Sequence, residues 1–292
     1  MLMLRAVAVT AICLLLSPRF AAAQSLDNPL GIASDGTKSG SLVICGGGRL
    51  PEPVYEEFIR LAGGKEAHIL HIPWAHPFSS MTSVRSSYSG WSGYDVASFG
   101  FLNIDAREEA DVDSFLKPLE NATGVWIGGG AQGRLTNLYG GTKVEAALQR
   151  VLARGGVIGG TSAGASAMST TMIRYGTATE AVTDRGLCLV KNAVIDQHFS
   201  QRNRLERLLG VIEQEPSQVG LGVDEGTALV VQSNRLKVIG SSRVTVCLPS
   251  SRGDGVTLHR LKDGDDMHLI AATTNNVANP RVAWELRRRS TK

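Results

Sequence analysis

The chain has 292 residues, of which 43% are hydrophobic and 20% charged, with a formal net charge of +3. This composition excludes an intrinsically disordered chain, and the near-neutral charge argues against a general nucleic-acid-binding protein, which needs a strong basic excess. The basic residues comprise 22 Arg and only 8 Lys, and Arg binds carboxylates in a planar, two-pronged manner that Lys cannot achieve.

The N-terminus has the layout of a secretory signal peptide. Residues 1–5 form a short basic start, residues 6–16 are apolar, and residues 21–23 are small. The apolar run is too short to span a bilayer. We therefore expect cleavage of residues 1–23 and a secreted or periplasmic mature protein that is not embedded in a membrane, with 28 basic and 27 acidic residues. The alternative is a buried N-terminal helix.

The next part of the chain predicts a parallel sheet. Residues 24–40 are rich in Ser, Gly and Asp and predict a flexible lead-in. Short apolar runs then alternate with helix-spaced patterns, which is typical of βαβ units. The predicted strands are Leu42–Cys45, His68–Ile72, Tyr94–Phe99, Gly124–Ile127 and Gly156–Gly160, and the predicted helices are Val54–Ala62 and Lys143–Arg154.

After about residue 190 the pattern changes to strands. One helix, Arg204–Ile212, interrupts the predicted strands Ala193–Ile195, Gly220–Val223, Ala228–Val231, Lys237–Ile239, Val244–Leu248, Val256–Arg260 and Met267–Ala271. No repeat or linker divides the mature chain. We expect residues 41–292 to form a single α/β domain with a mainly parallel, doubly wound sheet, to which the C-terminal part adds antiparallel strands.

No cofactor site is expected. The mature chain keeps Cys45, Cys188 and Cys247, each in an apolar stretch, and this odd number permits one disulfide at most. No CxxC or His-rich spacing suggests a metal site. The run Gly46–Gly48 lacks both GxGxxG spacing and a Walker lysine, so we interpret it as a turn or a pocket wall.

A G-x-S-x-G motif follows the predicted strand Gly156–Gly160 and contains Ser162. In this strand–turn–helix setting the turn is so tight that flanking side chains must be minimal, and it presents the serine hydroxyl at the start of a helix. Free backbone N–H groups at that point favour a developing negative charge. The alternative is a Gly/Ser-rich turn without chemistry.

A serine nucleophile needs a base and an orienting acid. His198 ends a predicted strand together with Asp196 and Gln197, and ligands of open α/β sheets bind beyond such carboxyl ends. Asp224 and Glu225 follow another strand, and either could orient His198. The alternative for these two acids is a hairpin turn with solvated carboxylates.

Four blocks together resemble the cyanophycinase branch of the serine-peptidase family that also contains aspartyl dipeptidase. They are Trp126–Gln132, Gly159–Ala165, Asp196–Leu209 and Gly222–Ala228. The third block, Asp-Gln-His-Phe with three arginines, is the most specific and separates this branch from the shorter dipeptidases. The resemblance runs from about Ser41 to the strand Val244–Leu248. It implies a fold like that of class I glutamine amidotransferases.

The resemblance also implies the roles of individual residues. Ser162 is then the nucleophile, His198 the general base and Glu225 the orienting acid. Backbone N–H groups of Ala163 and of Gly129 or Gly130 form the oxyanion hole. The substrate pocket is lined by Gln132, Asp196, Gln197, Arg202, Arg204 and Arg207. One departure is Ala131, where the family usually has a polar residue.

The implied activity is hydrolysis of cyanophycin to β-Asp-Arg dipeptides through an acyl-enzyme on Ser162, by a homodimeric exopeptidase. Each cyanophycin repeat presents a free carboxylate and a guanidinium. Arg204 and Arg207 share a helix face at i, i+3 and can hold carboxylates, while Asp196 can hold a guanidinium. The alternative is a solvated helix face on which the three arginines pair with Glu206, Glu213 and Glu215.

Three other functions are considered. An α/β-hydrolase esterase would combine Ser162 with His259 or His268. A related exopeptidase would act on short aspartyl or other isopeptides and reject the polymer. A non-catalytic binding protein is disfavoured because all three triad positions are filled.

Overall fold

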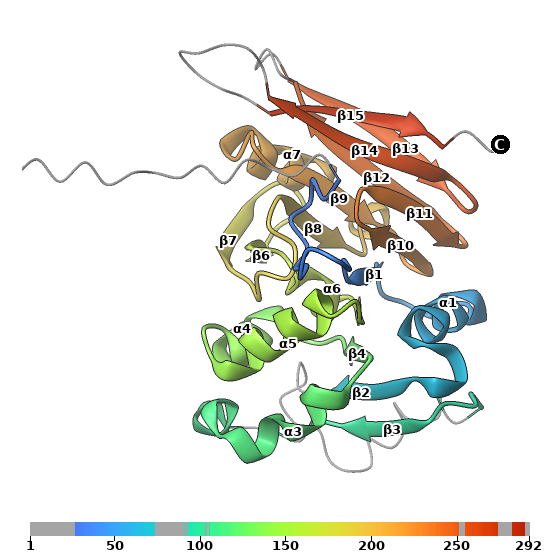
Figure 1. The fold of residues 1–292 in the computed structure, drawn as a ribbon. Helices are drawn as coiled ribbons and strands as arrows, with labels where there is room; N and C mark the ends of the chain where they lie inside the picture. The colour runs from blue at the N-terminus through green and yellow to red at the C-terminus, as the bar shows by residue number, and fades with distance from the viewer. Residues whose placement is uncertain are drawn as a thin grey trace, which may run out of the picture.

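The structure, a computed structural model, describes residues 27–73, 91, 93–102, 104, 106–250, 255–273 and 282–289. The predicted signal peptide and the start of the predicted lead-in lie outside these residues. The described strands form sheets of nine, four and two strands, with helices packed against them (Figure 1). None of the helices in the described ranges combines the length and the apolar character that crossing a membrane requires.

The nine-stranded sheet has the order β15-β14-β11-β10-β1-β5-β4-β2-β3. One half is parallel and consists of β1 (Ser41–Cys45), β5 (Val157–Thr161), β4 (Gly124–Ile127), β2 (His68–Ile72) and β3 (Ser98–Phe101). The other half is antiparallel and consists of β10 (Thr227–Gln232), β11 (Arg235–Gly240), β14 (Asp266–Thr273) and β15 (Val282–Arg288). The predicted fold class, a mainly parallel sheet extended by antiparallel C-terminal strands, is confirmed.

Helices cover both faces of the parallel half. They are α1 (Glu52–Ala62), α3 (Asp113–Asn121), α4 (Gln132–Tyr139), α5 (Lys143–Ala153) and α6 (Ala163–Ser166), with the 3-10 turns η1 (Gly64–Glu66) and η2 (Arg107–Asp111). Val43 of β1 lies in a buried cluster with Phe58 of α1. Its neighbour Leu42 lies in the cluster of the opposite face, with Leu119 of α3 and Leu148 of α5. Such two-sided cover explains why these strands read as continuous apolar runs.

The four-stranded sheet has the order β13-β12-β9-β8 and carries the second half of the site. Its strands are β13 (Val256–Lys262), β12 (Arg243–Pro249), β9 (Val219–Val223) and β8 (Ala193–Gln197), and only β8 and β9 are parallel to each other. Helix α7 (Leu205–Gln214) packs Leu208 and Ile212 against Val194 of this sheet. The hairpin of β6 (Thr171–Gly176) and β7 (Ala181–Arg185) forms the third sheet.

Backbone hydrogen bonds join the two large sheets where the site lies. The N–H of His198, directly after β8, donates to the carbonyl oxygen of Gly46 after β1, at 2.8 Å. Ser162 N donates to Cys45 O at 3.0 Å. The segments after β1, β5 and β8 therefore meet at one place.

Two sequence predictions are wrong in detail. The predicted strand Tyr94–Phe99 is displaced, because Tyr94 packs its ring near Tyr55 and Trp91, and pairing with β2 begins only at Ser98. The predicted flexible lead-in packs into the main core within its described part, where Leu30 and Ile32 are buried. Helices α3 and α4, the β6–β7 hairpin and β15 were not predicted, because their apolar patterns are short or interrupted.

Candidate active site

Ser162 occupies the sharp turn between β5 and α6. Its φ of 52° and ψ of −115° form a backbone conformation that L-residues rarely adopt. Close packing fixes the turn: a Cβ on Gly164 would lie 2.3 Å from the carbonyl oxygen of Ile127, and a Cβ on Gly160 would lie 2.7 Å from the backbone carbonyl of Gly164. Both positions therefore require glycine, as the G-x-S-x-G pattern predicts.

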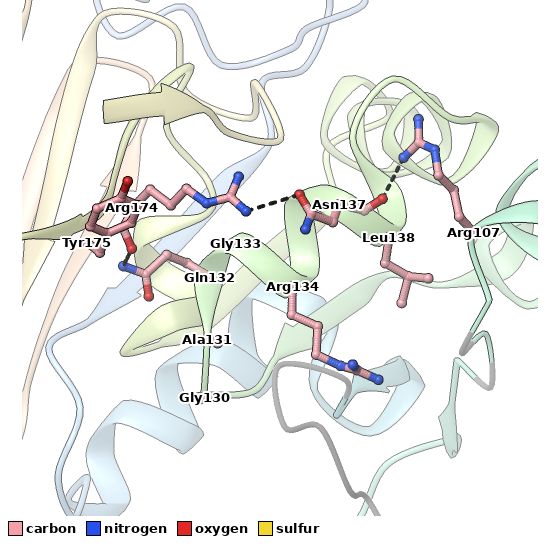
Figure 2. Close-up of a pocket in the computed structure, with 10 residues that line it drawn as sticks. All are labelled: Arg107, Gly130, Ala131, Gln132, Gly133, Arg134, Asn137, Leu138, Arg174 and Tyr175. Carbon is pink, nitrogen blue, oxygen red and sulfur yellow. Dashed lines mark hydrogen bonds between the residues drawn. The ribbon is translucent and has the colours of Figure 1, made fainter. Parts of the chain in front are cut away.

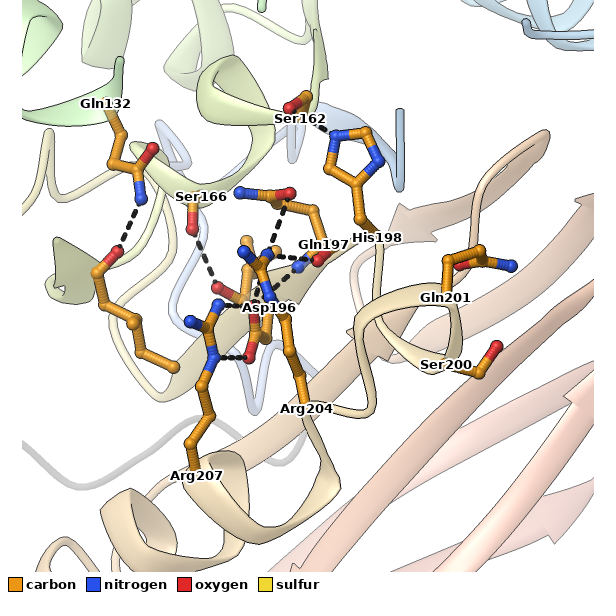
Figure 3. A network of polar contacts seen from close by, with 12 residues as sticks. Gln132, Ser162, Ser166, Asp196, Gln197, His198, Ser200, Gln201, Arg204 and Arg207 are labelled. Atoms are coloured by element: carbon orange, nitrogen blue, oxygen red, sulfur yellow. Dashed lines mark hydrogen bonds and ion pairs between the residues drawn. The ribbon is translucent and has the colours of Figure 1, made fainter. Parts of the chain in front are cut away.

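His198 follows β8 and lies beside the serine. Ser162 Oγ is 2.8 Å from His198 Nε2 (Figure 3). His198 has a positive φ of 48°, so two adjoining side chains of the site stand on left-handed backbone. Ser166 Oγ of α6 donates to the carbonyl oxygen of Ile195 in β8 at 3.0 Å, which ties the helix behind Ser162 to the strand that carries His198.

Glu225, and not Asp224, orients the histidine ring. Glu225 Oε1 is 2.5 Å from His198 Nδ1. The Asp224 carboxylate is buried and accepts hydrogen bonds from the N–H of Ser200 at 2.9 Å and from Ser242 Oγ at 2.8 Å. The choice between the two acids that the sequence left open is thereby made: Asp224 braces the loop after β8, and Glu225 completes a hydrogen-bonded Ser–His–Glu chain.

The glycine run after β1 forms the wall behind this chain. Gly47 has a φ of +97°, and a Cβ there would lie 2.4 Å from Cε1 of His198. Gly48 has a φ of +67°, and a Cβ there would lie 3.0 Å from Cβ of Glu225. The sequence interpretation as a turn or pocket wall agrees with this placement, but contact with the histidine and the glutamate was not foreseen.

The three residues expected to supply the oxyanion hole lie next to Ser162. A Cβ built on Gly129 would lie 3.4 Å from Cβ and 3.9 Å from Oγ of Ser162. Gly130 follows directly, with a φ of +140°. Ala163 is the first residue of α6, where the helix itself supplies no acceptor for the backbone N–H. The backbone of Gly129 and the first residue of α6 thus both lie next to Ser162.

A buried ionic network lies beneath the site (Figure 3). Asp196 is fully buried, and Arg207, only 3% exposed, grips it with two hydrogen bonds: Nε to Oδ2 at 2.7 Å and Nη2 to Oδ1 at 2.5 Å. Arg204 Nη1 is 3.4 Å from Asp196 Oδ1 and donates to the carbonyl oxygen of Gln197 at 2.6 Å and to its Oε1 at 3.2 Å.

This network corrects the roles that were expected for the charged residues Asp196, Arg204 and Arg207. Arg204 and Arg207 do share a face, but they meet Asp196 and form no ion pair, within the described residues, with Glu206, Glu213 or Glu215. Because Arg207 already occupies both oxygens of Asp196, that carboxylate is not free to hold a substrate guanidinium. Asp196 and Arg207 are therefore positioning residues, whose buried ion pair lies beneath the site.

Arg204 and Arg202 are the other two arginines of the expected substrate pocket. Arg204 is largely buried, and desolvation lowers its pKa to about 10, with smaller contributions from Arg207 and Arg202. The group stays charged at neutral pH, and an anionic ligand would relieve the cost of burying that charge. Arg202 lies in η3 (Ser200–Arg202) and is exposed.

Gln132 is fixed by the backbone of the β6–β7 hairpin. Its Nε2 donates to the carbonyl oxygens of Ile173 and Arg174, both at 2.9 Å. The side chain therefore links the start of α4 to β6 through its amide nitrogen. No sequence pattern indicated the partner strand, because β6 itself was not predicted.

The structure contains no sign of a metal or disulfide site in the part of the chain it describes. No group of three or more His, Cys, Asp or Glu side chains in that part is arranged to hold a metal ion. Cys45, Cys188 and Cys247 are free thiols. Burial raises the pKa of the Cys247 thiol to about 12 and that of Cys45 still further, so both behave as small apolar side chains.

Comparison with known proteins identifies the family. Residues 42–239 match the model of peptidase family S51. A cyanophycinase from Geminocystis herdmanii is 33% identical over 203 residues, which cover 66% of this chain and 74% of the relative. A cyanophycinase from Trichormus variabilis is 32% identical over 245 residues, covering 75% and 81%. A cyanophycinase from Synechococcus elongatus is 32% identical over 200 residues, which span 62% of its length.

The fold agrees with a solved structure. A peptidase from an acI-B1 Actinobacterium superposes with a TM-score of 0.64 and 22% sequence identity, over 79% of this chain and 97% of the other. At that identity the likeness concerns the fold alone. Together, the match over residues 42–239 and the relatives at 32–33% identity show that the chain belongs to peptidase family S51 and is a serine-type peptidase.

Proposed function

We propose that this chain is a secreted or periplasmic cyanophycinase that cleaves the polymer to β-Asp-Arg dipeptides through an acyl-enzyme on Ser162. The observation that carries the proposal is the hydrogen-bonded chain from Ser162 Oγ through His198 to Glu225, at 2.8 Å and 2.5 Å. The relatives named cyanophycinase support the substrate. Residues 1–23 support export.

In the proposed reaction, His198 Nε2 removes the proton of Ser162 Oγ as the oxygen attacks the α-amide carbonyl of an aspartyl unit. Glu225 holds the other ring nitrogen and stabilises the imidazolium that forms. Backbone N–H groups of Ala163 and of Gly129 or Gly130 stabilise the tetrahedral oxyanion.

The tetrahedral intermediate then collapses. His198 donates its proton to the leaving amine, and the acyl-enzyme ester remains on Ser162. Water, deprotonated by His198, attacks this ester and releases the dipeptide and the free serine. No cofactor is required for any of these steps.

Substrate recognition in this proposal depends on Arg204 more than on the other charged residues. Its side chain is 12% exposed and makes only one long contact with Asp196, at 3.4 Å, so part of the guanidinium can receive the carboxylate of a repeat. Gln197 provides an amide group beside it, Gln132 provides another at the start of α4, and Arg202 provides a second, exposed cation. Asp196 and Arg207 act through the position of Arg204.

The decisive experiment incubates the mature protein, residues 24–292, with insoluble cyanophycin and measures β-Asp-Arg in the supernatant. We expect steady release by the wild type and none by Ser162→Ala. Cleavage of short isoaspartyl peptides without release from the polymer would instead favour the related exopeptidase. Absence of hydrolysis of either substrate would contradict the proposal.

The esterase alternative is disfavoured by one observation. The base that contacts Ser162 is His198, whereas His268 Nδ1 is 3.2 Å from Asn234 Oδ1 on the antiparallel half of the sheet, and His259 lies on β13. Turnover of short acyl esters should therefore disappear in His198→Ala. Homodimerisation, which the family resemblance implies, is tested by light scattering of the purified protein, and localisation by fractionation of the producing cells.

A further inference from the structure

A cavity of about 810 Å³ opens beside the candidate active site (Figure 2). It lies between η2, the start of α4 and the end of β6, and its size suits a dipeptide-sized group. The residues that line it are Arg107, Gly130, Ala131, Gln132, Gly133, Arg134, Asn137, Leu138, Arg174 and Tyr175. The lining shares Gly130 and Gln132 with the expected site but contains none of the Ser–His–Glu residues and none of the Asp196 network, so the cavity extends the site described above.

The cavity continues directly from the serine. Its wall begins at Gly130, one residue after Gly129, which lies against Ser162. Its opposite wall is Arg174, whose backbone carbonyl accepts a hydrogen bond from the Gln132 side chain at 2.9 Å. An extended ligand that reaches the serine past Gly129 and Gly130 can therefore continue into this space.

The charged side chains among the described lining residues are all positive. Among the described residues that line the cavity, three are arginines and none is acidic. Arg107 is held rigidly, since its Nη1 donates to Asn137 O at 2.7 Å and its Nη2 to Gly140 O at 2.8 Å. Because these described partners are neutral carbonyl groups, the positive charge of Arg107 can favour an anion in the cavity.

Arg174 has an ion-pair partner that a ligand carboxylate can replace. It forms an ion pair with Asp184, which is 43% exposed, and a 3.4 Å hydrogen bond with Asn137 Oδ1. Its guanidinium lies over Gly133, where a Cβ would be 2.9 Å from Nε. Ion pairs that are this exposed contribute little stability, so a carboxylate inside the cavity can replace Asp184.

We propose that this cavity is a second substrate subsite, which binds the free α-carboxylate of a cyanophycin repeat adjacent to the two repeats joined by the cleaved bond, with Arg174 as its principal ligand. The inference rests on the proposed function, because only a polymeric substrate carries a further carboxylate beyond the two repeats joined by the cleaved bond. Tyr175, 61% exposed, offers its ring to the guanidinium of the same repeat. The subsite thus gives preference for long chains over short ones.

The test compares two soluble substrates with the full mature enzyme. A two-repeat fragment supplies only the two repeats joined by the cleaved bond, whereas a five-repeat fragment also supplies the further repeat that the proposed subsite would bind. For Arg174→Gln we expect KM for the five-repeat fragment to rise about tenfold, which corresponds to one charged hydrogen bond. KM for the two-repeat fragment and both kcat values should stay unchanged.

A variant with the opposite effect excludes simple damage to the fold. Asp184→Asn releases Arg174 from its partner, and we expect it to lower KM for the five-repeat fragment only. Arg150→Gln serves as a control for the loss of one charge, because Arg150 is exposed on α5 and does not line the cavity.

The outcomes separate the two proposals. If the wild type hydrolyses neither fragment, the cyanophycinase function fails and the subsite with it. If the wild type hydrolyses both, but Arg174→Gln and Asp184→Asn leave the ratio of the two KM values as it is in the wild type, the subsite alone is overturned. Equal losses on both fragments in Arg174→Gln would likewise overturn it.

Discussion

The imidazole ring of His198 lies directly against Gly47: a Cβ at this glycine would stand 2.4 Å from Cε1 and 2.6 Å from Nε2. Gly47→Ala should therefore push the ring away from Ser162. Because a displacement of about 1 Å can cost a factor of about 100 in rate, we expect kcat to fall about 100-fold. Hydrolysis of cyanophycin fragments, together with circular dichroism to verify folding, measures the effect.

Gly36→Ala is the matched control for this substitution. Gly36 has a φ of +90°, close to the +97° of Gly47, but a Cβ there would meet no atom within 4 Å. Both variants carry the strain of left-handed backbone, about 1–2 kcal/mol, and only Gly47→Ala also meets the ring. Equal activity of the two variants would refute the steric argument.

The strained backbone of Ser162 makes a second prediction. Ser162→Ala and His198→Ala should each lower kcat by several orders of magnitude while the fold persists, because the triad acts as a unit. Ser162→Gly should be equally inactive, but more stable than Ser162→Ala by about 1 kcal/mol, since glycine adopts a φ of 52° without strain. Thermal unfolding of the two inactive variants compares them; a less stable glycine variant would contradict the strain.

The sequence predicted the local structure at Ser162 and before His198 better than the contacts around them. The G-x-S-x-G turn and the apolar strand before His198 are local patterns, and local patterns can be read from spacing. Spacing alone left Asp224 and Glu225 open, and only the family resemblance pointed to Glu225, because the choice depends on Ser200 and Ser242, which reach Asp224 from other parts of the chain. The fold class was predicted because βαβ alternation is likewise local.

The Asp196 network shows the same limit for charged residues. Helical spacing correctly predicted that Arg204 and Arg207 share one face. Spacing alone does not identify the residue that this face contacts. The partner, Asp196, lies on β8, and the pairing depends on how α7 packs across that sheet. The cavity lined by Arg174 was missed because β6 has only a short apolar pattern.

Breaking the Asp196–Arg207 pair should destabilise the protein. Arg207→Met leaves a carboxylate that is fully buried without its two-pronged partner, and removal of one member of such a pair costs about 3–5 kcal/mol. The double variant Asp196→Asn/Arg207→Met should recover a large part of the loss, because no unpaired carboxylate then remains buried. Urea denaturation measures both, with exposed Arg202→Met expected to change stability by less than about 0.5 kcal/mol.

Arg204 should affect substrate binding more than the chemical step. Arg204→Ala removes a desolvated cation that faces the site but does not touch Ser162 or His198, so we expect KM to rise at least about tenfold with kcat changed much less. Arg204→Lys should recover binding only partly, because an ammonium cannot form the planar, two-pronged contact. An unchanged KM in Arg204→Ala would refute its role as a carboxylate ligand.

His71 should make the stability of the fold depend on pH. It is 4% exposed near the end of β2, its Nδ1 has no hydrogen-bond partner among the described residues, and desolvation lowers its pKa from 6.5 to about 4. The unfolded chain therefore binds the proton first as the pH falls. The free energy of unfolding should be highest above pH 6.5 and should decrease as the pH falls to 4, by on the order of 3 kcal/mol.

Urea denaturation at pH 7.5 and pH 4.5 measures this dependence. His71→Leu cannot take up a proton and suits the neighbouring ring of Phe101, whose centroid is 5.7 Å from that of His71. The difference in stability between the two pH values should therefore shrink in this variant. His68→Gln, at an exposed position of the same strand, should leave the difference as in the wild type. An equal difference in His71→Leu and the wild type would show that other groups cause it.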